Sequence, residues 1–262
     1  MAHTFLLTTR DGPIERLTLN RPEVRNAFNE TLIAELTEWA GAIASDGDVR
    51  VVVLSGAGKA FCAGADLAWM SKVVSYTHDE NVRDATAAAA MYGALDALPM
   101  PVIGRIHGAA LGGGAGLAAI CDIAVADEET VFGFTEVKLG IVPAMISPFV
   151  LRRIGESAAR ELFLTGMRFD AARAKEIGLV HAVVPSSALD ARIDGYVDEV
   201  LAAAPEAVAT IKRLLRRVVG RDPLDVRGLT AETLALRRAS AEGQEGMQAF
   251  LQKRKAAWVL PR

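Results

Sequence analysis

The chain has 262 residues, of which 51% are hydrophobic, and a formal net charge of -3. A chain of this length and hydrophobic content can bury one sizeable core, with or without a smaller helical appendage, which argues against extended disorder. The weakly acidic balance excludes a global attraction to nucleic acid or to an anionic membrane, so any anionic ligand must be held by local groups.

The apolar stretches of this sequence do not indicate export or membrane insertion. The run at residues 5–7 is too short for the core of a signal peptide. The longest uncharged stretch, residues 106–121, is shorter than a membrane span and rich in glycine, which favours a buried segment. Cys62 and Cys121 are too few for a disulfide scaffold, which fits a reducing compartment, and neither has a metal-ligand partner nearby in the sequence. We therefore expect a soluble, cytoplasmic protein without a metal ion.

The first part of the chain predicts a hairpin, a helix and a strand. Residues 5–9 and 14–19 place apolar side chains on either side of Asp11-Gly12-Pro13, a turn signal that predicts an opening hairpin. Asn29 is positioned to cap a helix whose apolar side chains recur at helical spacing. The apolar run at residues 51–54 then predicts a strand.

Two glycine-rich motifs follow, separated by a helix and a strand. The first motif is Ala60-Phe61-Cys62-Ala63-Gly64-Ala65-Asp66-Leu67. A polar stretch at residues 75–81, which we expect to be mobile, leads into an alanine-rich helix that two prolines after residue 98 terminate. The next strand is expected at residues 102–106, and the second motif, His107 to Gly116, begins the following helix.

The remainder of the chain predicts two short strands and then helices. The strands are expected at residues 123–126 and 131–134, and the chain from Pro148 onward is helical in pattern almost throughout. Repeated strand and helix units imply parallel strand pairing with right-handed crossovers, hence an α/β fold. We expect a core over residues 1–195 and a helical C-terminal region over residues 196–262. The apolar stripes of that region predict packing against another subunit.

Each glycine-rich motif places small residues where a strand gives way to a helix. Small residues let the backbone turn tightly and leave backbone N–H groups free to face a ligand. Two such groups that converge on one oxygen form an oxyanion hole, which stabilises negative charge as it develops during a reaction. The two motifs together predict such a hole.

Several motifs in a fixed order carry a resemblance to a known family. These are Leu19-Asn20-Arg21-Pro22 with Asn26-Ala27-Phe28, the two glycine-rich motifs, Cys121-Asp122-Ile123-Ala124, and the Glu-Val-Lys-Leu-Gly-Ile-Val-Pro run at residues 136–143. In order and spacing they resemble the crotonase (enoyl-CoA hydratase/isomerase) superfamily over almost the whole chain. The resemblance implies a crotonase-like spiral of ββα units with a helical C-terminal region, assembled as a homotrimer or a dimer of trimers.

The resemblance also implies a substrate class and a place for the oxyanion hole. Family members act on acyl-CoA thioesters, and because CoA is part of the substrate no separate cofactor is expected. The thioester oxygen is held by two backbone N–H groups that correspond here to Ala65 and Gly113. Addition of water to a 2-enoyl thioester places enolate charge on that oxygen, so fixed donors stabilise the transition state more than the substrate.

Family hydratases use two glutamates, of which one has a counterpart in this chain. The second aligns with Glu136, whereas Gly116 stands at the position of the first. One carboxylate must then perform both proton transfers of hydration, or receive help from another residue or from water. A single glutamate also resembles the family's isomerases, in which one carboxylate moves a proton between carbons. Residues 65–70 and 143–148 resemble the methylglutaconyl-CoA hydratase branch, which favours hydration of a 2-enoyl-CoA with a branched or methylglutaconyl-type acyl group.

Glu136 is expected to have a raised pKa. Apolar residues surround it in the sequence, among them Phe134, Val137 and Leu139. Burial among such side chains disfavours the charged carboxylate and suits proton transfer near neutral pH.

The resemblance places the CoA portion of the substrate along the first motif and the turn before it. The matching residues are Arg25, Ala27 and the segment Ala63 to Leu67, in which Asp66 and Leu67 contribute mainly backbone. Arg25 could pair with a CoA phosphate, because guanidinium suits phosphate oxygens.

Two further sets of residues complete the predicted substrate site. Lys253, in a basic cluster with the two residues that follow it, could meet the ribose phosphate across a subunit boundary. The candidate walls of the acyl pocket are Trp69, Met70, Tyr76 and Met145.

Other functions remain open beside hydration and isomerisation. A thioester hydrolase on the same hole would use His107, with Ser147 as an imaginable nucleophile, although nothing resembles a nucleophile elbow. A non-catalytic acyl-CoA-binding or RNA-binding homologue would keep the scaffold without the chemistry. The acidic balance and the lack of an aromatic and basic stripe argue against nucleic acid. We therefore expect an enoyl-CoA hydratase, a lyase, that binds neither nucleic acid nor membranes.

Overall fold

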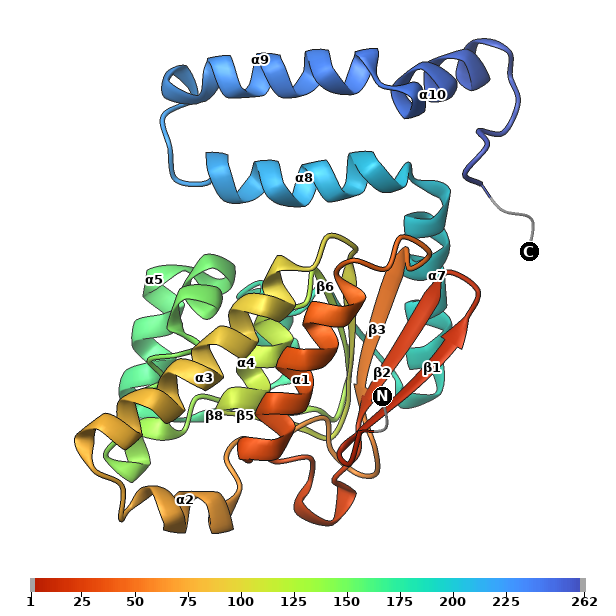
Figure 1. Ribbon diagram of the computed structural model, residues 1–262. Helices are drawn as coiled ribbons and strands as arrows, with labels where there is room; N and C mark the ends of the chain where they lie inside the picture. Colours follow the sequence, from red (N-terminus) through yellow and green to blue (C-terminus); the bar gives the residue numbers. More distant parts are fainter. Residues whose placement is uncertain (1–2, 260–262) are drawn as a thin grey trace.

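A six-stranded sheet organises residues 3–259, the part of the chain that the computed structural model describes (Figure 1). In spatial order its strands are β1 (Leu6–Asp11), β2 (Ile14–Leu19), β3 (Val51–Gly56), β4 (Val102–Ile106), β6 (Ile123–Asp127) and β9 (Ala182–Val184). Strands β1 and β2 form the predicted antiparallel hairpin. The other neighbouring pairs are parallel, as strand and helix alternation requires.

A smaller sheet lies beside the second glycine-rich motif. Its strands are β5 (Ala109–Leu111), β7 (Val131–Gly133) and β8 (Arg168–Asp170), with β7 parallel to β5 and antiparallel to β8. The sequence pattern did not indicate β5, and the almost wholly helical region expected after Pro148 is interrupted by β8 and β9. Each of these strands has three residues, too few for an alternating apolar pattern to distinguish a strand from a loop.

Helices cover both faces of the main sheet. The apolar core on one face contains buried side chains of α1 (Glu30–Ile43), α3 (His78–Ala97), α4 (Gly113–Ile120) and α5 (Ser147–Thr165). The other face packs against α7 (Leu189–Ala202), whose Leu189, Ile193 and Val197 contact the sheet. Strand β3 serves both cores because its side chains alternate, Val52 toward the first layer and Val53 toward α7. The predicted division after residue 195 therefore falls inside a helix that packs on the sheet.

Two helix starts follow from local capping chemistry. The side chain of Asn29 accepts a hydrogen bond from the Leu32 N–H at 2.9 Å, which confirms the predicted cap of α1. Residues 75–81, predicted to be mobile, instead contain the start of α3. Thr77 and Glu80 form a reciprocal capping box there, with Thr77 N donating to Glu80 at 2.8 Å and Glu80 N donating to the Thr77 hydroxyl at 3.3 Å.

The remaining short helices connect these layers. They are η1 (Pro22–Val24), α2 (Leu67–Val73), η2 (Glu136–Leu139), α6 (Ala171–Glu176) and η3 (Ser186–Ala188). Within residues 3–259, no helix combines the length and apolarity needed to cross a membrane.

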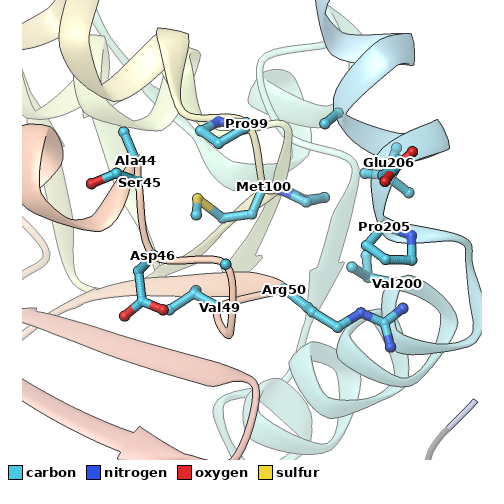
Figure 2. A pocket seen from close by; sticks show the side chains of 14 residues that line it. Ala44, Ser45, Asp46, Val49, Arg50, Pro99, Met100, Val200, Pro205 and Glu206 are labelled. Carbon is cyan, nitrogen blue, oxygen red and sulfur yellow. The ribbon is translucent and has the colours of Figure 1, made fainter. Parts of the chain in front are cut away.

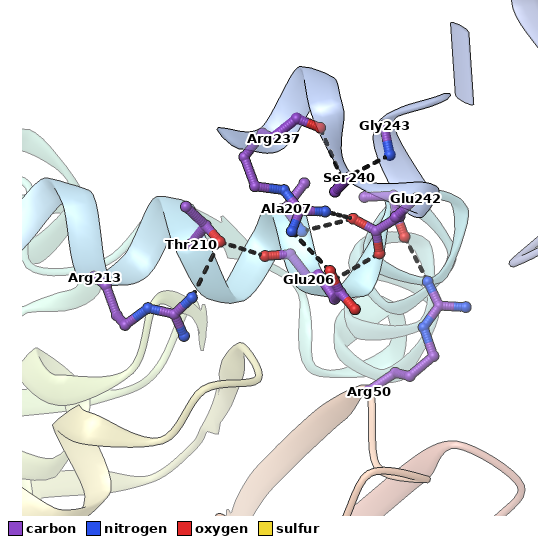
Figure 3. Close-up of polar contacts among 10 residues, drawn as sticks. Arg50, Glu206, Ala207, Thr210, Arg213, Arg237, Ser240, Glu242 and Gly243 are labelled. Carbon is purple, nitrogen blue, oxygen red and sulfur yellow. Dashed lines mark hydrogen bonds and ion pairs between the residues drawn. The ribbon is translucent and has the colours of Figure 1, made fainter. Parts of the chain in front are cut away.

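The C-terminal helices α8 (Pro205–Val218), α9 (Pro223–Ala239) and α10 (Ala241–Leu251) extend from the end of the molecule opposite α2 (Figure 1). Glu242 ties them together, because its carboxylate accepts hydrogen bonds from the first N–H groups of α8, Glu206 at 2.8 Å and Ala207 at 2.9 Å (Figure 3). Arg237 pairs with both Glu206 and Glu242 at 2.7 and 2.5 Å. The α8 N-terminus, the end of α9 and the start of α10 thus form one polar cluster.

Candidate active site

The two glycine-rich motifs lie side by side. Cys62 N donates to Ala109 O and Leu111 N donates to Cys62 O, each at 3.0 Å. A Cβ on Gly114 would lie 2.1 Å from Cys62 O, so this close approach of two backbones requires glycine. The segments that follow, Ala65 and the start of α4, are thereby brought together.

The Ala65 N–H points away from Phe28, the residue with which Ala65 is paired. Phe28 N donates to Gly64 O at 2.7 Å, and Asp66 N donates to Phe28 O at 2.9 Å. In this parallel bridge the residue between the two bonds directs its own N–H and C=O outward. Ala65 is exposed, and no hydrogen bond within residues 3–259 uses its N–H as donor.

Gly113 supplies a second N–H. It is the first residue of α4, so its N–H has no acceptor within the helix, and it donates to no other group among residues 3–259. Tyr92 donates its hydroxyl to Gly113 O at 2.8 Å, and a Cβ at this position would lie 2.7 Å from that hydroxyl oxygen and 3.0 Å from the Phe28 ring. Phe28 thus holds the Ala65 segment with its backbone and contacts Gly113 with its ring.

Glu136 lies beside the turn that starts α4. It is the first residue of η2, and its Oε1 is 3.2 Å from the position that a Cβ on Gly112 would take. Its Oε2 is buried and has no hydrogen-bond partner among the described residues. Burial raises the pKa of this carboxyl above its usual value, as predicted.

The residues next to Glu136 in the sequence account for its burial only in part. Val137 and Leu139, which were expected to enclose Glu136, are 37% and 60% exposed. Phe134 is buried. The glycine turn before α4, which comes close to the carboxylate across the fold, is a neighbour that the local sequence did not reveal.

Gly116 has no room for a carboxylate. A Cβ there would lie 2.3 Å from Ile146 Cγ2 and 3.2 Å from Tyr92 Cε1. Ile146, which no sequence motif indicated, is 2% exposed and fills the space beside this turn of α4. An apolar wall therefore stands where a two-glutamate site would place its first carboxylate.

Most of the predicted CoA residues gather around the first motif. Arg25 O accepts a hydrogen bond from Ala63 N at 3.0 Å, and the Arg25 side chain is exposed. Ala27 is buried, whereas Leu67 at the start of α2 is 80% exposed and Met70 is half-buried.

Other predicted residues have different surroundings. The Asp66 carboxylate is buried and accepts a hydrogen bond from the Arg21 guanidinium. Trp69 is buried in the core, and its indole N–H donates to Asp84 at 3.3 Å. Lys253 comes two residues after α10, whereas the first motif ends where α2 begins. Helices α10 and α2 lie at opposite ends of the molecule, so one chain does not bring Lys253 to the first motif (Figure 1).

The residues considered for a hydrolase have other partners. His107 Nε2 is 3.0 Å from Gly58 O, and its Nδ1 is 3.4 Å from an Arg105 guanidinium nitrogen. The Ser147 hydroxyl donates to Ala144 O at 2.8 Å. The described part of the chain therefore does not arrange His107 and Ser147 as a catalytic pair.

A pocket of about 210 Å³ lies elsewhere, between the end of α1, the loop before β4 and the start of α8 (Figure 2). Val49, Met100 and Pro205 contribute to its wall. Its lining includes neither of the free N–H groups nor Glu136, so it is separate from the candidate site.

Comparisons with known proteins show which family the chain belongs to. Residues 9–260 match the family profile described as enoyl-CoA hydratase/isomerase. A curated protein of Thermus thermophilus, whose name assigns it provisionally to the enoyl-CoA hydratases, is 36% identical over 249 residues, 95% of this chain and 98% of that protein. The solved enoyl-CoA hydratase of Shewanella pealeana superposes with a TM-score of 0.94 at 38% identity, covering 97% of this chain and 96% of that one.

A second solved structure extends the comparison. The enoyl-CoA hydratase/isomerase of Marinobacter aquaeolei has a TM-score of 0.92 and 37% identity, covering 98% of this chain and 99% of that one. The chain therefore belongs to the enoyl-CoA hydratase/isomerase family, the crotonase superfamily.

Proposed function

We propose that this protein adds water across the 2,3 double bond of an enoyl-CoA thioester. The observation that carries the proposal is the position of Glu136, whose buried and unpartnered oxygen lies beside the turn that presents the free Gly113 N–H. A partly buried carboxylate next to a backbone donor suits proton transfer to a carbonyl compound. The family name covers both enoyl-CoA hydratases and isomerases, and the name of the Shewanella pealeana structure specifies an enoyl-CoA hydratase, which supports the same reaction.

In the proposed mechanism, the thioester oxygen accepts hydrogen bonds from the Ala65 and Gly113 N–H groups. Glu136 takes a proton as water attacks C3, and the electron pair of the double bond moves to the oxygen as an enolate. The two donors and the positive end of α4 stabilise that charge. The enolate then reforms the thioester carbonyl as C2 receives the proton from Glu136, which restores the carboxylate.

Isomerisation of a 3-enoyl-CoA is the second candidate, and Ile146 favours it. Its side chain fills the space beside Gly116, so a second carboxylate cannot hold the attacking water there. One carboxylate suffices for isomerisation, because it removes a proton from C2 and returns it at C4. For hydration, the proposed acyl group is a branched or methylglutaconyl-type chain.

A pair of substrates separates these activities. With a 2-enoyl-CoA we expect the absorbance of the conjugated thioester to fall as water adds. A gain of that absorbance from a 3-enoyl-CoA would instead identify an isomerase, and release of free thiol from either substrate would identify a hydrolase. Binding without turnover would identify a non-catalytic homologue. A panel of straight, branched and carboxylated enoyl-CoAs then defines the acyl group.

Exposed apolar side chains support a proposed homotrimer or dimer of trimers. On the C-terminal helices, Ile211, Leu215 and Phe250 are 53%, 53% and 84% exposed, and in the loop after η2 Val142 is 70% exposed. Side chains of this kind in contiguous patches mark association surfaces. We expect light scattering to give three or six times the 27.8 kDa of one chain. A monomeric mass at assay concentration would contradict the assembly, and with it the proposed contact of Lys253 with CoA bound to another subunit.

A further inference from the structure

We propose that Arg21 is a positioning residue that fixes the Ala65 N–H through the side chain of Asp66. The inference rests on the proposed role of Ala65 as an oxyanion donor. Arg21 Nη2 lies 2.7 Å from Asp66 Oδ2, and the two side chains are only 9% and 8% exposed. Neither side chain is therefore free to meet the substrate, yet Asp66 directly follows the donor residue.

The two carboxylate oxygens of Asp66 accept hydrogen bonds from different groups. Oδ2 is bound by Arg21, while Oδ1 accepts the Ala68 N–H at 2.7 Å and caps α2. Its backbone N–H donates to Phe28 O at 2.9 Å. The residue after Ala65 is thus fixed by three contacts, which hold the peptide plane that follows Ala65. The hydrogen bond from Phe28 N to Gly64 O at 2.7 Å holds the plane that carries the Ala65 N–H, so the backbone is restrained on both sides of the donor residue.

Arg21 is itself immobilised. Its Nη1 donates to Ala27 O at 2.6 Å, and its guanidinium lies 4.6 Å from the centre of the Phe5 ring. Its backbone N–H donates to the Asn26 side chain at 2.8 Å, and that fully buried side chain also donates to Ala60 O at 2.8 Å. Asn26 therefore joins the turn at residues 21–28 to the first glycine-rich motif.

The Arg21–Asp66 ion pair is better suited to orienting the backbone than to stabilising the fold. A buried ion pair often contributes no more stability than apolar side chains of the same volume would. Burial alone would raise the pKa of Asp66, but the hydrogen bonds from Arg21 and from the N–H groups of Ala68 and Trp69 outweigh it and lower that pKa. The carboxylate is therefore kept charged, and its bonds have fixed directions that apolar contacts lack.

The test compares Arg21→Met, Asp66→Asn and the double variant by kcat and KM with the 2-enoyl-CoA or 3-enoyl-CoA that the wild type converts. Displacement of a reacting group by about 1 Å can cost about 100-fold in rate, so we expect kcat to fall about 10- to 100-fold with KM changed less than about threefold. Because Arg21 acts through Asp66, the double variant should lose no more than the worse single variant. Asp66→Asn retains a side-chain oxygen for capping α2, so it carries the test if Arg21→Met does not fold.

A spectroscopic measurement distinguishes positioning from general destabilisation. Hydrogen bonds to a thioester carbonyl lower its stretching frequency, so an acyl-CoA labelled with ¹³C at the carbonyl reports on the donors directly. We expect a smaller lowering in Arg21→Met than in the wild type. Lys212→Met is the matched control, because it breaks the Lys212–Asp122 pair of 2.6 Å, which lies at the sheet end near α8 and in which the lysine side chain is 11% exposed. It should lower thermal stability without changing kcat or the carbonyl frequency.

The possible results separate the two proposals. Three results would overturn the role of Arg21 while leaving the oxyanion hole intact. They are a wild-type kcat in both single variants, a loss of kcat in Lys212→Met as large as in Arg21→Met, and a carbonyl frequency of the bound acyl-CoA in Arg21→Met that equals that in the wild type. If the wild type itself does not lower the carbonyl frequency on binding, the oxyanion role of Ala65 and Gly113 fails, and the role of Arg21 fails with it.

Discussion

Replacing Gly113 with valine is expected to lower kcat at least about 100-fold while the chain remains folded. A Cβ at this position would lie 2.7 Å from the Tyr92 hydroxyl oxygen and 3.0 Å from the Phe28 ring. Because both rings are buried and have little room to move, we expect the start of α4 to shift. The shift carries the Gly113 N–H away from the thioester oxygen. Loss of one oxyanion donor typically lowers kcat about 100- to 1000-fold. Steady-state kinetics with the substrate that the wild type converts, together with circular dichroism, measure both parts of the expectation.

A matched pair of variants isolates the N–H from the added bulk. In a Tyr92→Phe background, which removes the nearest hydroxyl, Gly113→Ala and Gly113→Pro both add a Cβ, but only proline removes the donor. Proline is well tolerated at the first position of a helix, which Gly113 occupies in α4. We expect the proline variant to be at least about 100-fold slower than the alanine variant. Equal rates would show that the Gly113 N–H does not act as an oxyanion donor.

The elements that the sequence predicted well are those with a local chemical signal. The apolar run at residues 51–54 and the side chain of Asn29 specify β3 and the start of α1 without help from distant residues. Thr77 and Glu80 carried a capping box that indicated the start of α3, although the polarity of the stretch suggested mobility. The three-residue strands β5, β8 and β9 depend on pairing with distant segments, which local periodicity cannot show.

In the candidate site, too, the sequence predicted the features that have a local signal and missed the contacts between distant residues. The glycines that allow two backbones to approach closely could be recognised in the sequence. At Gly114, for example, a Cβ would lie 2.1 Å from Cys62 O, so no other residue fits there. The sequence could not show that Phe28 contacts both donor segments or that Ile146 fills the space beside Gly116, since both contacts join residues far apart in the chain. Asp66 was expected beside the CoA, and its motif gave no indication that its carboxylate would be bound to Arg21.

Glu136→Gln is the variant expected to remove most turnover while preserving thioester binding. The amide has nearly the shape of the carboxyl group but cannot accept the proton, and proton transfer by such a group contributes about 100- to 10,000-fold to rate. Binding should persist, because the proposed N–H donors and CoA contacts are unchanged. Titration of a non-reactive acyl-CoA measures binding, and kcat measures turnover. Glu129→Gln is the control, since Glu129 is exposed in the turn after β6 and should retain wild-type values for both.

The raised pKa of Glu136 gives this prediction a pH dependence with a defined sign. Burial favours the protonated form, so a base at this position becomes active as pH rises through a value above that of an ordinary glutamate. The wild-type rate should therefore show an acidic limb that the glutamine variant lacks. A group whose folded-state pKa is raised stabilises the fold below its unfolded-state pKa, and that contribution is lost as pH rises through the folded-state value. Because glutamine does not ionise, Glu136→Gln should unfold at neutral pH no more readily than the wild type. Unchanged turnover in a folded Glu136→Gln protein would contradict the proposed proton-transfer role, whichever of the two reactions the enzyme catalyses.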